Sequence, residues 1–356
     1  MSTRSVIIGT GSHIPAVRVP NDFFLERDFR GTDGKALGKS NPEILEQFAS
    51  ITGIKERRYV PEGISTSDIA FDAAADALNS SGVDPETLDY LIVAHNFGDV
   101  RRSGRSDMVP AIAARVKSKL RIATPRTVAF DLIFGCPGWL QGMIVADAFI
   151  KTGTARRALI IGAETLSRVS DPHDRDGLIY ADGAGATILE ARDSDEPVGI
   201  LSHAARSDTL DHSGMLFMGP SYNEEVFLEA LFLKMEGRKL YRYALQTVAG
   251  SMKSCLDAAG IRLEDVAKIL LHQANGKMDD AIVTELYGIC GAKQPRDVLP
   301  MTISWLGNSS VATVPTLLDL ITKGRLEGHT INSGDVLLFG SVGAGMNINA
   351  MVYRVP

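Results

Sequence analysis

The sequence predicts an α/β fold built from two similar halves, and three observations lead to this prediction. Short apolar runs rich in β-branched residues alternate with segments whose apolar residues recur every three or four positions. This alternation is typical of buried, mostly parallel strands connected by helices. Landmarks of the first half recur in the second half. Of the 356 residues, 45% are hydrophobic and 22% are charged, which is typical of a globular protein and excludes disordered and collagen-like chains.

Each expected element follows from its local pattern. The strands are short apolar runs bounded by glycine or polar residues, and they are predicted at residues 6–8, 90–94, 127–130, 158–161, 269–271 and 336–339. The helices are longer segments with one apolar face, and they are predicted at residues 67–78, 137–150, 241–259 and 311–321. Most strands that follow one another along the chain are therefore separated by a predicted helix.

A comparison of the chain with itself indicates a duplication. The residues around Gly82 match those around Gly260, and the apolar run that ends at Gly162 matches the run that ends at Gly340. Both matches have the same offset, which equals half of the 356-residue chain. A repeated offset of this size is the pattern of a duplicated structural unit. The sequence thus predicts two units, over residues 1–180 and 181–356.

The composition also limits the partners and the compartment. With 37 Lys and Arg against 43 Asp and Glu, the net charge of −6 argues against binding to nucleic acid. The N-terminus lacks a secretory pattern, and no apolar run approaches the roughly 18 residues of a membrane span. Three cysteines are too few for a disulfide framework. We therefore expect a cytoplasmic protein that does not insert into a membrane.

Several short motifs indicate structure rather than function. Gly9-Thr10-Gly11 lacks the third glycine and the following helix of a dinucleotide-binding turn. The carboxylates and the histidine between Asp171 and Asp176 match no metal-ligand spacing, so we expect no metal site. The Gly-x-Ser-x-Gly and His-Glu-x-x-His motifs are absent from the sequence, which disfavours serine hydrolases and zinc proteases.

Cys136 is the candidate nucleophile. It follows a predicted strand and precedes a predicted helix, and Pro137 suits the first position of that helix. Cys136 would then be the N-cap, where the helix dipole is expected to lower the pKa of the thiol toward neutrality. Cys255 and Cys290 fall inside or beside helical patterns and are expected to be inert. An inert buried thiol remains the alternative for Cys136 as well.

His272 and Asn308 are candidates only in combination with Cys136. His272 ends a predicted buried strand, and the carboxyl ends of strands are where α/β sheets bind ligands. A structural histidine is an equally good interpretation of His272 alone. Asn308 precedes a predicted helix and would by default be its N-cap. Together, the three side chains suggest a nucleophile with two hydrogen-bonding groups.

These candidates and their neighbours resemble, in order and spacing, the condensing enzymes of the β-ketoacyl-acyl-carrier-protein synthase III family. The resemblance covers nearly the whole chain and implies a thiolase fold, in which two α/β halves form a five-layered α-β-α-β-α structure and the protein is a homodimer. The segments that carry the resemblance are Ile7-Ile8-Gly9-Thr10-Gly11, Thr52-Gly53-Ile54-Lys55-Glu56-Arg57, Cys136, Asp182-Gly183-Ala184-Gly185-Ala186, His272-Gln273-Ala274-Asn275, Gly307-Asn308-Ser309 and Gly340-Ser341-Val342-Gly343.

The resemblance implies a reaction in two steps. Cys136 would take an acyl group from a thioester carried on coenzyme A or on the phosphopantetheine of an acyl carrier protein, and no other cofactor is expected. His272 and Asn308 would then stabilise the enolate formed when a malonyl thioester loses carbon dioxide. The N–H groups of Cys136 and near Gly343 would form the oxyanion hole. This is the initiating condensation of fatty-acid synthesis, or of a specialised lipid or polyketide pathway.

The alternative function is an acyltransferase of the same fold that moves the acyl group to an acceptor other than malonate. Such a transfer needs a nucleophile but forms no enolate. The presence of both His272 and Asn308 therefore favours condensation.

Departures from the family pattern concern the substrate. Gln47 and Ile51 stand where the family usually has a tryptophan and an arginine that hold coenzyme A, whereas Arg175 is retained. Lys277 stands where an arginine often docks the carrier. Val109 aligns with an aromatic residue that reaches in from the partner subunit and limits the acyl pocket. The resemblance thus implies a primer longer than acetyl, delivered by a carrier protein. Residues 21–46 form a longer segment than the family norm, and the sequence does not indicate its role.

Overall fold

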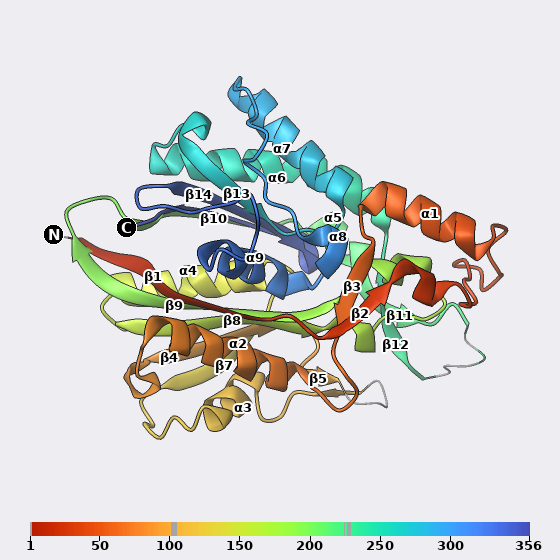
Figure 1. Ribbon diagram of the computed structural model, residues 1–356, viewed down its shortest axis with the longest axis horizontal. Helices are drawn as coiled ribbons and strands as arrows, with labels where there is room; N and C mark the ends of the chain where they lie inside the picture. Colours follow the sequence, from red (N-terminus) through yellow and green to blue (C-terminus); the bar gives the residue numbers. More distant parts are fainter. Residues whose placement is uncertain (1, 101–104, 224, 226–228) are drawn as a thin grey trace.

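The structure is a computed structural model that describes residues 2–100, 105–223, 225 and 229–356. Two β-sheets lie one above the other, with helices between them and on both outer faces, so that five layers can be followed from top to bottom in Figure 1. The five-layered arrangement implied by the resemblance is confirmed. Among the described helices, none is both long and apolar enough to cross a membrane.

The first sheet has the strand order β1-β9-β8-β4-β7. Its outer face is covered by α2 (Thr66–Ser81) and α3 (Ile112–Lys119). The bounds of its strands are Ser2–His13 for β1, Asp182–Ser194 for β9, Arg157–Thr165 for β8, Tyr90–His95 for β4 and Val128–Ile133 for β7.

The second sheet has the order β10-β15-β14-β13, which repeats the arrangement of β1, β9, β8 and β4 in the first sheet. Two central helices, α4 (Gly138–Lys151) and α9 (Thr313–Thr322), lie between the sheets. Two outer helices, α6 (Gly237–Ala259) and α7 (Gly276–Cys290), cover the other face of the second sheet. Its strands are Gly199–Ser207 for β10, Asn347–Arg354 for β15, Val336–Gly343 for β14 and Val266–Leu271 for β13.

The remaining elements are short and lie around one end of the two sheets. They include the helix α1, which begins inside the segment that is longer than the family norm and continues past it. Their bounds are Val17–Pro20 for β2, Asn41–Thr52 for α1, Glu56–Tyr59 for β3, Asp99–Val100 for β5, Ser106–Asp107 for β6, Thr209–His212 for α5, Leu216–Pro220 for β11, Leu231–Met235 for β12 and Ile303–Leu306 for α8.

Parallel pairing is confirmed for most of the strands that the sequence predicted, since β4, β7, β8, β13 and β14 each have a parallel neighbour. The two sheets as a whole are mixed. Only β4 with β7, β4 with β8 and β13 with β14 pair in parallel among the described strands of the two sheets, whereas β9 and β15 pair antiparallel with both of their neighbours. For β15, the reason is the length of the connection. Only residues 344–346 separate β14 from β15, and a parallel pair needs a crossover of a dozen residues or more.

The expected boundary between residues 180 and 181 does not separate the two sheets. The strand β9 begins at Asp182, but it pairs with β1 and β8 of the first sheet. The chain reaches the second sheet only with β10, which begins at Gly199. The polar loop that suggested the boundary is therefore a connection within the first half.

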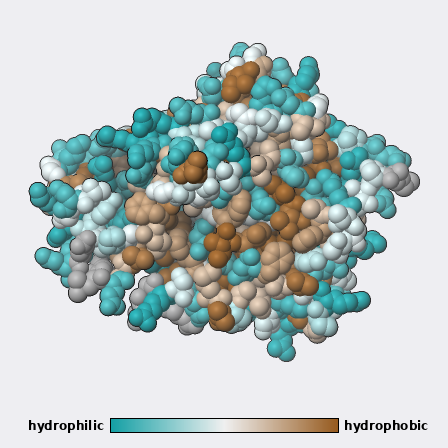
Figure 2. All heavy atoms as spheres, turned by 180° about the vertical axis from the view of Figure 1, so that it is seen from behind, coloured by the Kyte–Doolittle hydropathy of each residue, from teal (hydrophilic) through white to brown (hydrophobic). Residues whose placement is uncertain are grey.

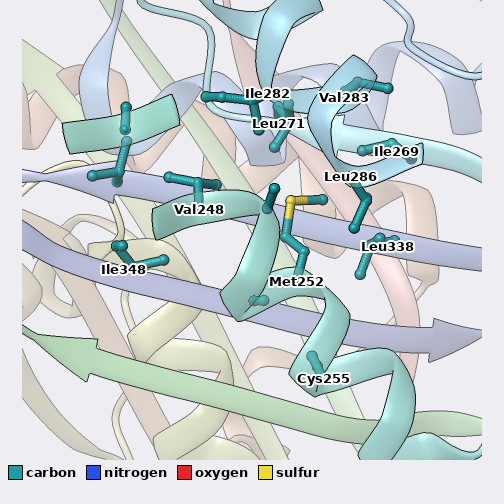
Figure 3. Close-up of a cluster of buried hydrophobic side chains, with 14 of the residues drawn as sticks. Val248, Met252, Cys255, Ile269, Leu271, Ile282, Val283, Leu286, Leu338 and Ile348 are labelled. Atoms are coloured by element: carbon teal, nitrogen blue, oxygen red, sulfur yellow. The ribbon is translucent and has the colours of Figure 1, made fainter. Parts of the chain in front are cut away.

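Apolar residues of α6 and α7 hold these helices against the second sheet. Figure 3 shows Val248 of α6 above Ile348 of β15 and Leu286 of α7 above Leu338 of β14, with Met252 of α6 between them, all of them buried. Their helical spacing of three or four residues places one apolar face on the sheet. Cys255 belongs to the same cluster and is completely buried, as expected for an inert thiol.

The strand β7 forms one edge of the first sheet and pairs only with β4 among the described strands. Two of its apolar side chains are exposed, Val128 by 49% and Ile133 by 60%. Figure 2, which views the molecule from behind Figure 1, shows hydrophobic side chains gathered over the middle of that face.

Candidate active site

Cys136, His272 and Asn308 line one cavity of about 220 Å³. They reach it from separate parts of the fold. Cys136 lies between β7 and α4, His272 directly follows β13, and Asn308 follows α8. The strands β7 and β13 belong to different sheets, so the cavity lies where the two halves meet. The structure thus brings together the three residues that the sequence singled out.

Cys136 is held at a tight turn before α4. The N–H of Gly138 donates to the carbonyl of Gly135 at 2.9 Å, and the helix begins at Gly138 with Pro137 as its N-cap. Cys136 therefore lies one residue before the N-cap of α4, whereas it was expected to be the N-cap itself. Gly135 has a φ of 75°, and a Cβ there would lie 2.8 Å from the N of Ala344. Only glycine fits this turn without a shift of the neighbouring backbone.

The expected lowering of the Cys136 thiol pKa is wrong. Burial raises this pKa to about 11, and the negative charge of Glu164 acts in the same direction. The hydroxyl of Ser310, which donates to the sulfur at 3.3 Å, opposes the increase. Desolvation is the largest of these effects on the thiolate. At neutral pH, Cys136 is therefore a thiol.

His272 is a buried, neutral imidazole. Its main-chain N–H donates to the carbonyl of Gly340 at 2.9 Å, which anchors it beside β14. Burial lowers the pKa of His272 to about 4, and its Nδ1 has no hydrogen-bond partner among the described residues. A neutral imidazole has one N–H donor and one acceptor nitrogen, so His272 can hydrogen-bond a bound substrate without carrying a charge.

Asn308 is held on both its main chain and its side chain. Its N–H donates to Ile179 at 2.9 Å and its carbonyl accepts from Ala181 at 2.8 Å. The side-chain Oδ1 accepts from the N–H of Ser310 at 2.8 Å. This bond orients the amide and leaves its N–H groups without a partner among the described residues. Asn308 can therefore donate to a substrate oxygen in the cavity.

Gly343 lies directly beside Cys136. A Cβ at Gly343 would be 2.5 Å from the N of Cys136 and 2.9 Å from its Cβ. Real Cβ atoms do not approach so closely, so any larger residue would push the nucleophile away. The absence of a side chain at Gly343 thus permits close approach of its backbone to the N–H of Cys136.

A groove of about 860 Å³ adjoins the cavity and shares Ile179, Met235, Leu240, Ala274 and Met278 with it. Arg175, Arg238 and Arg242 also line the groove, as do Gln47 and Ile51 of α1. The residues that the sequence associated with coenzyme A therefore lie at one opening. Lys277, the residue associated with the carrier, is exposed at the start of α7 and is not among the residues that line the groove.

Val109 lies outside the cavity of its own chain. Its side chain is 87% exposed, and it is not among the residues that line the cavity. A role in limiting the acyl pocket therefore requires a second subunit.

Sequence reasoning missed much of the cavity wall. The hairpin of β11 and β12 contributes apolar side chains, among them Phe217 and Leu233, and Tyr180 lies beneath them. This hairpin carries no motif, so its place could not be inferred. Ser310 was also missed, although its position two residues after Asn308 is the one available signal.

A metal centre is also not indicated: no group of three or more His, Cys, Asp or Glu side chains in the described part of the chain could hold an ion.

Comparisons with known proteins agree with this geometry. Residues 130–209 match the family model of 3-oxoacyl-[acyl-carrier-protein] synthase III, and residues 256–355 match the model of its C-terminal part. A β-ketoacyl-[acyl-carrier-protein] synthase III of Erythrobacter litoralis is 33% identical over 99% of both chains, and one of Sphingopyxis alaskensis is 32% identical over 100% of both. The crystal structure of the Pseudomonas aeruginosa synthase III superimposes with a TM-score of 0.80 at 26% identity, covering 99% of this chain and 98% of that one.

Proposed function

The chain belongs to the 3-oxoacyl-[acyl-carrier-protein] synthase III family, and we propose that Cys136, His272 and Asn308 perform its decarboxylating condensation. The observation that carries this assignment is that all three side chains line one cavity. The protein is a condensing acyltransferase of the fatty-acid initiation type.

The first half-reaction is acyl transfer to Cys136. The sulfur attacks the carbonyl carbon of an acyl thioester, the bond to the carrier sulfur breaks, and the thiol proton leaves with the carrier thiol. The oxyanion that forms is stabilised by the N–H of Cys136 and by an N–H near Gly343. The close approach of the Gly343 backbone to Cys136 supports this second donor.

The second half-reaction forms the carbon–carbon bond. A malonyl thioester loses carbon dioxide, and the electrons of the broken bond form an enolate whose oxygen accepts hydrogen bonds from His272 and Asn308. The carbanion attacks the acyl-enzyme, and the Cys136 sulfur leaves. The unpartnered amide of Asn308 and the neutral imidazole of His272 support these roles. We propose that the substrates need no cofactor beyond coenzyme A or the phosphopantetheine of a carrier protein.

The groove beside the cavity is proposed to admit the thioester arm. Its volume of about 860 Å³ and its three arginines suit an extended chain that ends in a phosphate. Arg175 is proposed to contact that phosphate, and Lys277 an acidic carrier protein. The three unpaired cysteines support a reducing compartment such as the cytoplasm.

Charge reversal at Lys277 tests the carrier surface. We expect Lys277→Glu to raise the KM for carrier-linked malonate several-fold and to weaken its dependence on salt, because a long-range attraction is lost. Lys293→Glu, an exposed lysine beyond the other end of α7, is the matched control and should leave KM unchanged. An unchanged KM in Lys277→Glu would remove this residue from the carrier interface.

We further propose that the protein is a homodimer in which Val109 of one subunit borders the acyl pocket of the other. The exposed Val109 and the exposed apolar edge strand β7 support an interface on this side of the first sheet. Valine in place of an aromatic ring leaves room for further methylenes, each worth about 0.8 kcal/mol when buried.

Primer length tests this arrangement. Wild type should be acylated faster by hexanoyl or decanoyl than by acetyl thioesters, and faster from carrier protein than from coenzyme A. Val109→Phe should slow only the longer primers, with the acetyl rate as its internal control. If acetyl-coenzyme A is the best primer, if the variant keeps the same profile, or if the chain sediments as a monomer, the proposed pocket is wrong.

A further inference from the structure

A row of hydrogen bonds in the wall of the cavity ends at the sulfur of Cys136. The Glu164 Oε2 accepts from the main-chain N–H of Asn96 at 2.9 Å and from its Nδ2 at 2.7 Å. The same Nδ2 also donates to the Oγ of Ser310 at 3.3 Å. The Ser310 hydroxyl in turn donates to the sulfur of Cys136 at 3.3 Å.

The four residues come from four separate segments that converge on this point. Asn96 directly follows β4, Glu164 lies near the end of β8, and Ser310 begins the short turn before α9. Cys136 precedes α4. The strands β4 and β8 run parallel, so Asn96 and Glu164 meet at the same edge of the first sheet.

The chemistry of these groups fixes the direction of every bond. Both bonds between Asn96 and Glu164 start at N–H groups of Asn96, which can only donate, so they keep this direction although burial raises the pKa of Glu164 to about 7. The second N–H of the Asn96 amide then points at Ser310, whose oxygen must accept. A hydroxyl has one proton, and with its oxygen accepting from Asn96, that proton is directed to the sulfur.

Burial and further hydrogen bonds also hold the residues of this row in place. Glu164 is fully buried and Ser310 is 3% exposed. Ser310 has a φ of 53°, an uncommon backbone conformation for a residue other than glycine. Its N–H is held by the side chain of Asn308 at 2.8 Å. One residue thus orients the amide of Asn308 with its backbone and contacts Cys136 with its side chain.

The sulfur needs such a donor because its surroundings oppose a negative charge. The titratable groups that face Cys136 are Glu164, Tyr180 and His272. None of them supplies a positive charge at neutral pH, since His272 is neutral and the other two are acids. A hydrogen bond from a neutral hydroxyl is the stabilisation that remains beside the helix N-terminus.

We propose that Ser310 is a positioning residue that donates its hydroxyl proton to the Cys136 sulfur and thereby stabilises the thiolate, and that Asn96 and Glu164 hold it in this orientation. This hydrogen bond stabilises negative charge on the sulfur at two points of the reaction. The first is when the sulfur attacks the primer, and the second is when it leaves after condensation. The inference rests on the proposed role of Cys136 as the nucleophile, but its test requires no substrate.

The test is the pH dependence of Cys136 alkylation by iodoacetamide in the full-length protein, followed by mass spectrometry of the peptide that contains Cys136. In Ser310→Ala, the midpoint should move upward by about one pH unit, which is a roughly tenfold slower alkylation at neutral pH. Ser309→Ala is the matched control, because the Ser309 hydroxyl contacts the Thr313 hydroxyl at 3.3 Å instead of the sulfur. Its midpoint should equal that of wild type.

A second variant distinguishes orientation from structural damage. Asn96→Ala should raise the midpoint in the wild-type background but cause no further shift in the Ser310→Ala background, because both changes remove the same bond to sulfur. Thermal unfolding identifies variants that fail to fold. An unchanged midpoint in Ser310→Ala, an equal shift in Ser309→Ala, or additive shifts in the double variant would each overturn the proposal. A failure of condensation with a normal alkylation profile would instead count against the proposed function alone.

Discussion

Replacement of Cys136 by alanine should abolish covalent acylation of the protein. The acyl group is expected on this sulfur because Cys136 alone among the three cysteines lines the cavity that contains His272 and Asn308. No other group at that place can form the thioester, so the loss should be complete rather than partial. The measurement is the intact mass of the protein after incubation with a panel of acyl thioesters.

The other two cysteines provide matched controls. Cys255 is completely buried on the core-facing side of α6, and Cys290 lies at the end of α7. Cys255→Ala and Cys290→Ala should both keep the mass increase. An acyl adduct that persists in Cys136→Ala would refute the nucleophile assignment.

His272→Ala and Asn308→Ala should separate the two half-reactions. Both variants should still form the acyl-enzyme, whereas release of carbon dioxide from a malonyl thioester should fall about 10²- to 10³-fold for each, as expected for loss of one donor to an oxyanion. Acylation is followed by intact mass and decarboxylation by release of labelled carbon dioxide.

His203→Ala is the control for this pair, because His203 lies in β10 and does not line the cavity. Its two rates should match those of wild type. If His272→Ala instead lost acylation and decarboxylation equally, His272 would act by activating Cys136.

The sequence predicted the fold where single segments carry enough information. The apolar run at residues 90–94 lies in β4, and the helical spacing at residues 241–259 lies in α6. The antiparallel strands β9, β10 and β15 were not predicted from the sequence. The antiparallel course of β15 depends on the three-residue connection after β14, which no periodicity reveals.

The same limit applies to the site. Cys136, His272 and Asn308 could be selected because each follows or precedes a recognisable element. The direction of the Cys136 pKa shift could not be inferred, since it is set by burial between two halves of the chain. Likewise, the bond from Ser310 to Cys136 joins residues 174 positions apart, and nothing in the local sequence of either residue indicates the other.

The central claim is that the cavity condenses an acyl group with a decarboxylated malonyl unit. A single turnover tests it most directly: wild-type protein that carries a measured amount of acyl group on Cys136 is mixed with malonyl-carrier protein, and carbon dioxide and the product are quantified together. We predict one carbon dioxide and one β-ketoacyl-carrier for each acyl-enzyme consumed. Loss of the acyl group to an acceptor without release of carbon dioxide would contradict the account and would identify an acyltransferase of the same fold.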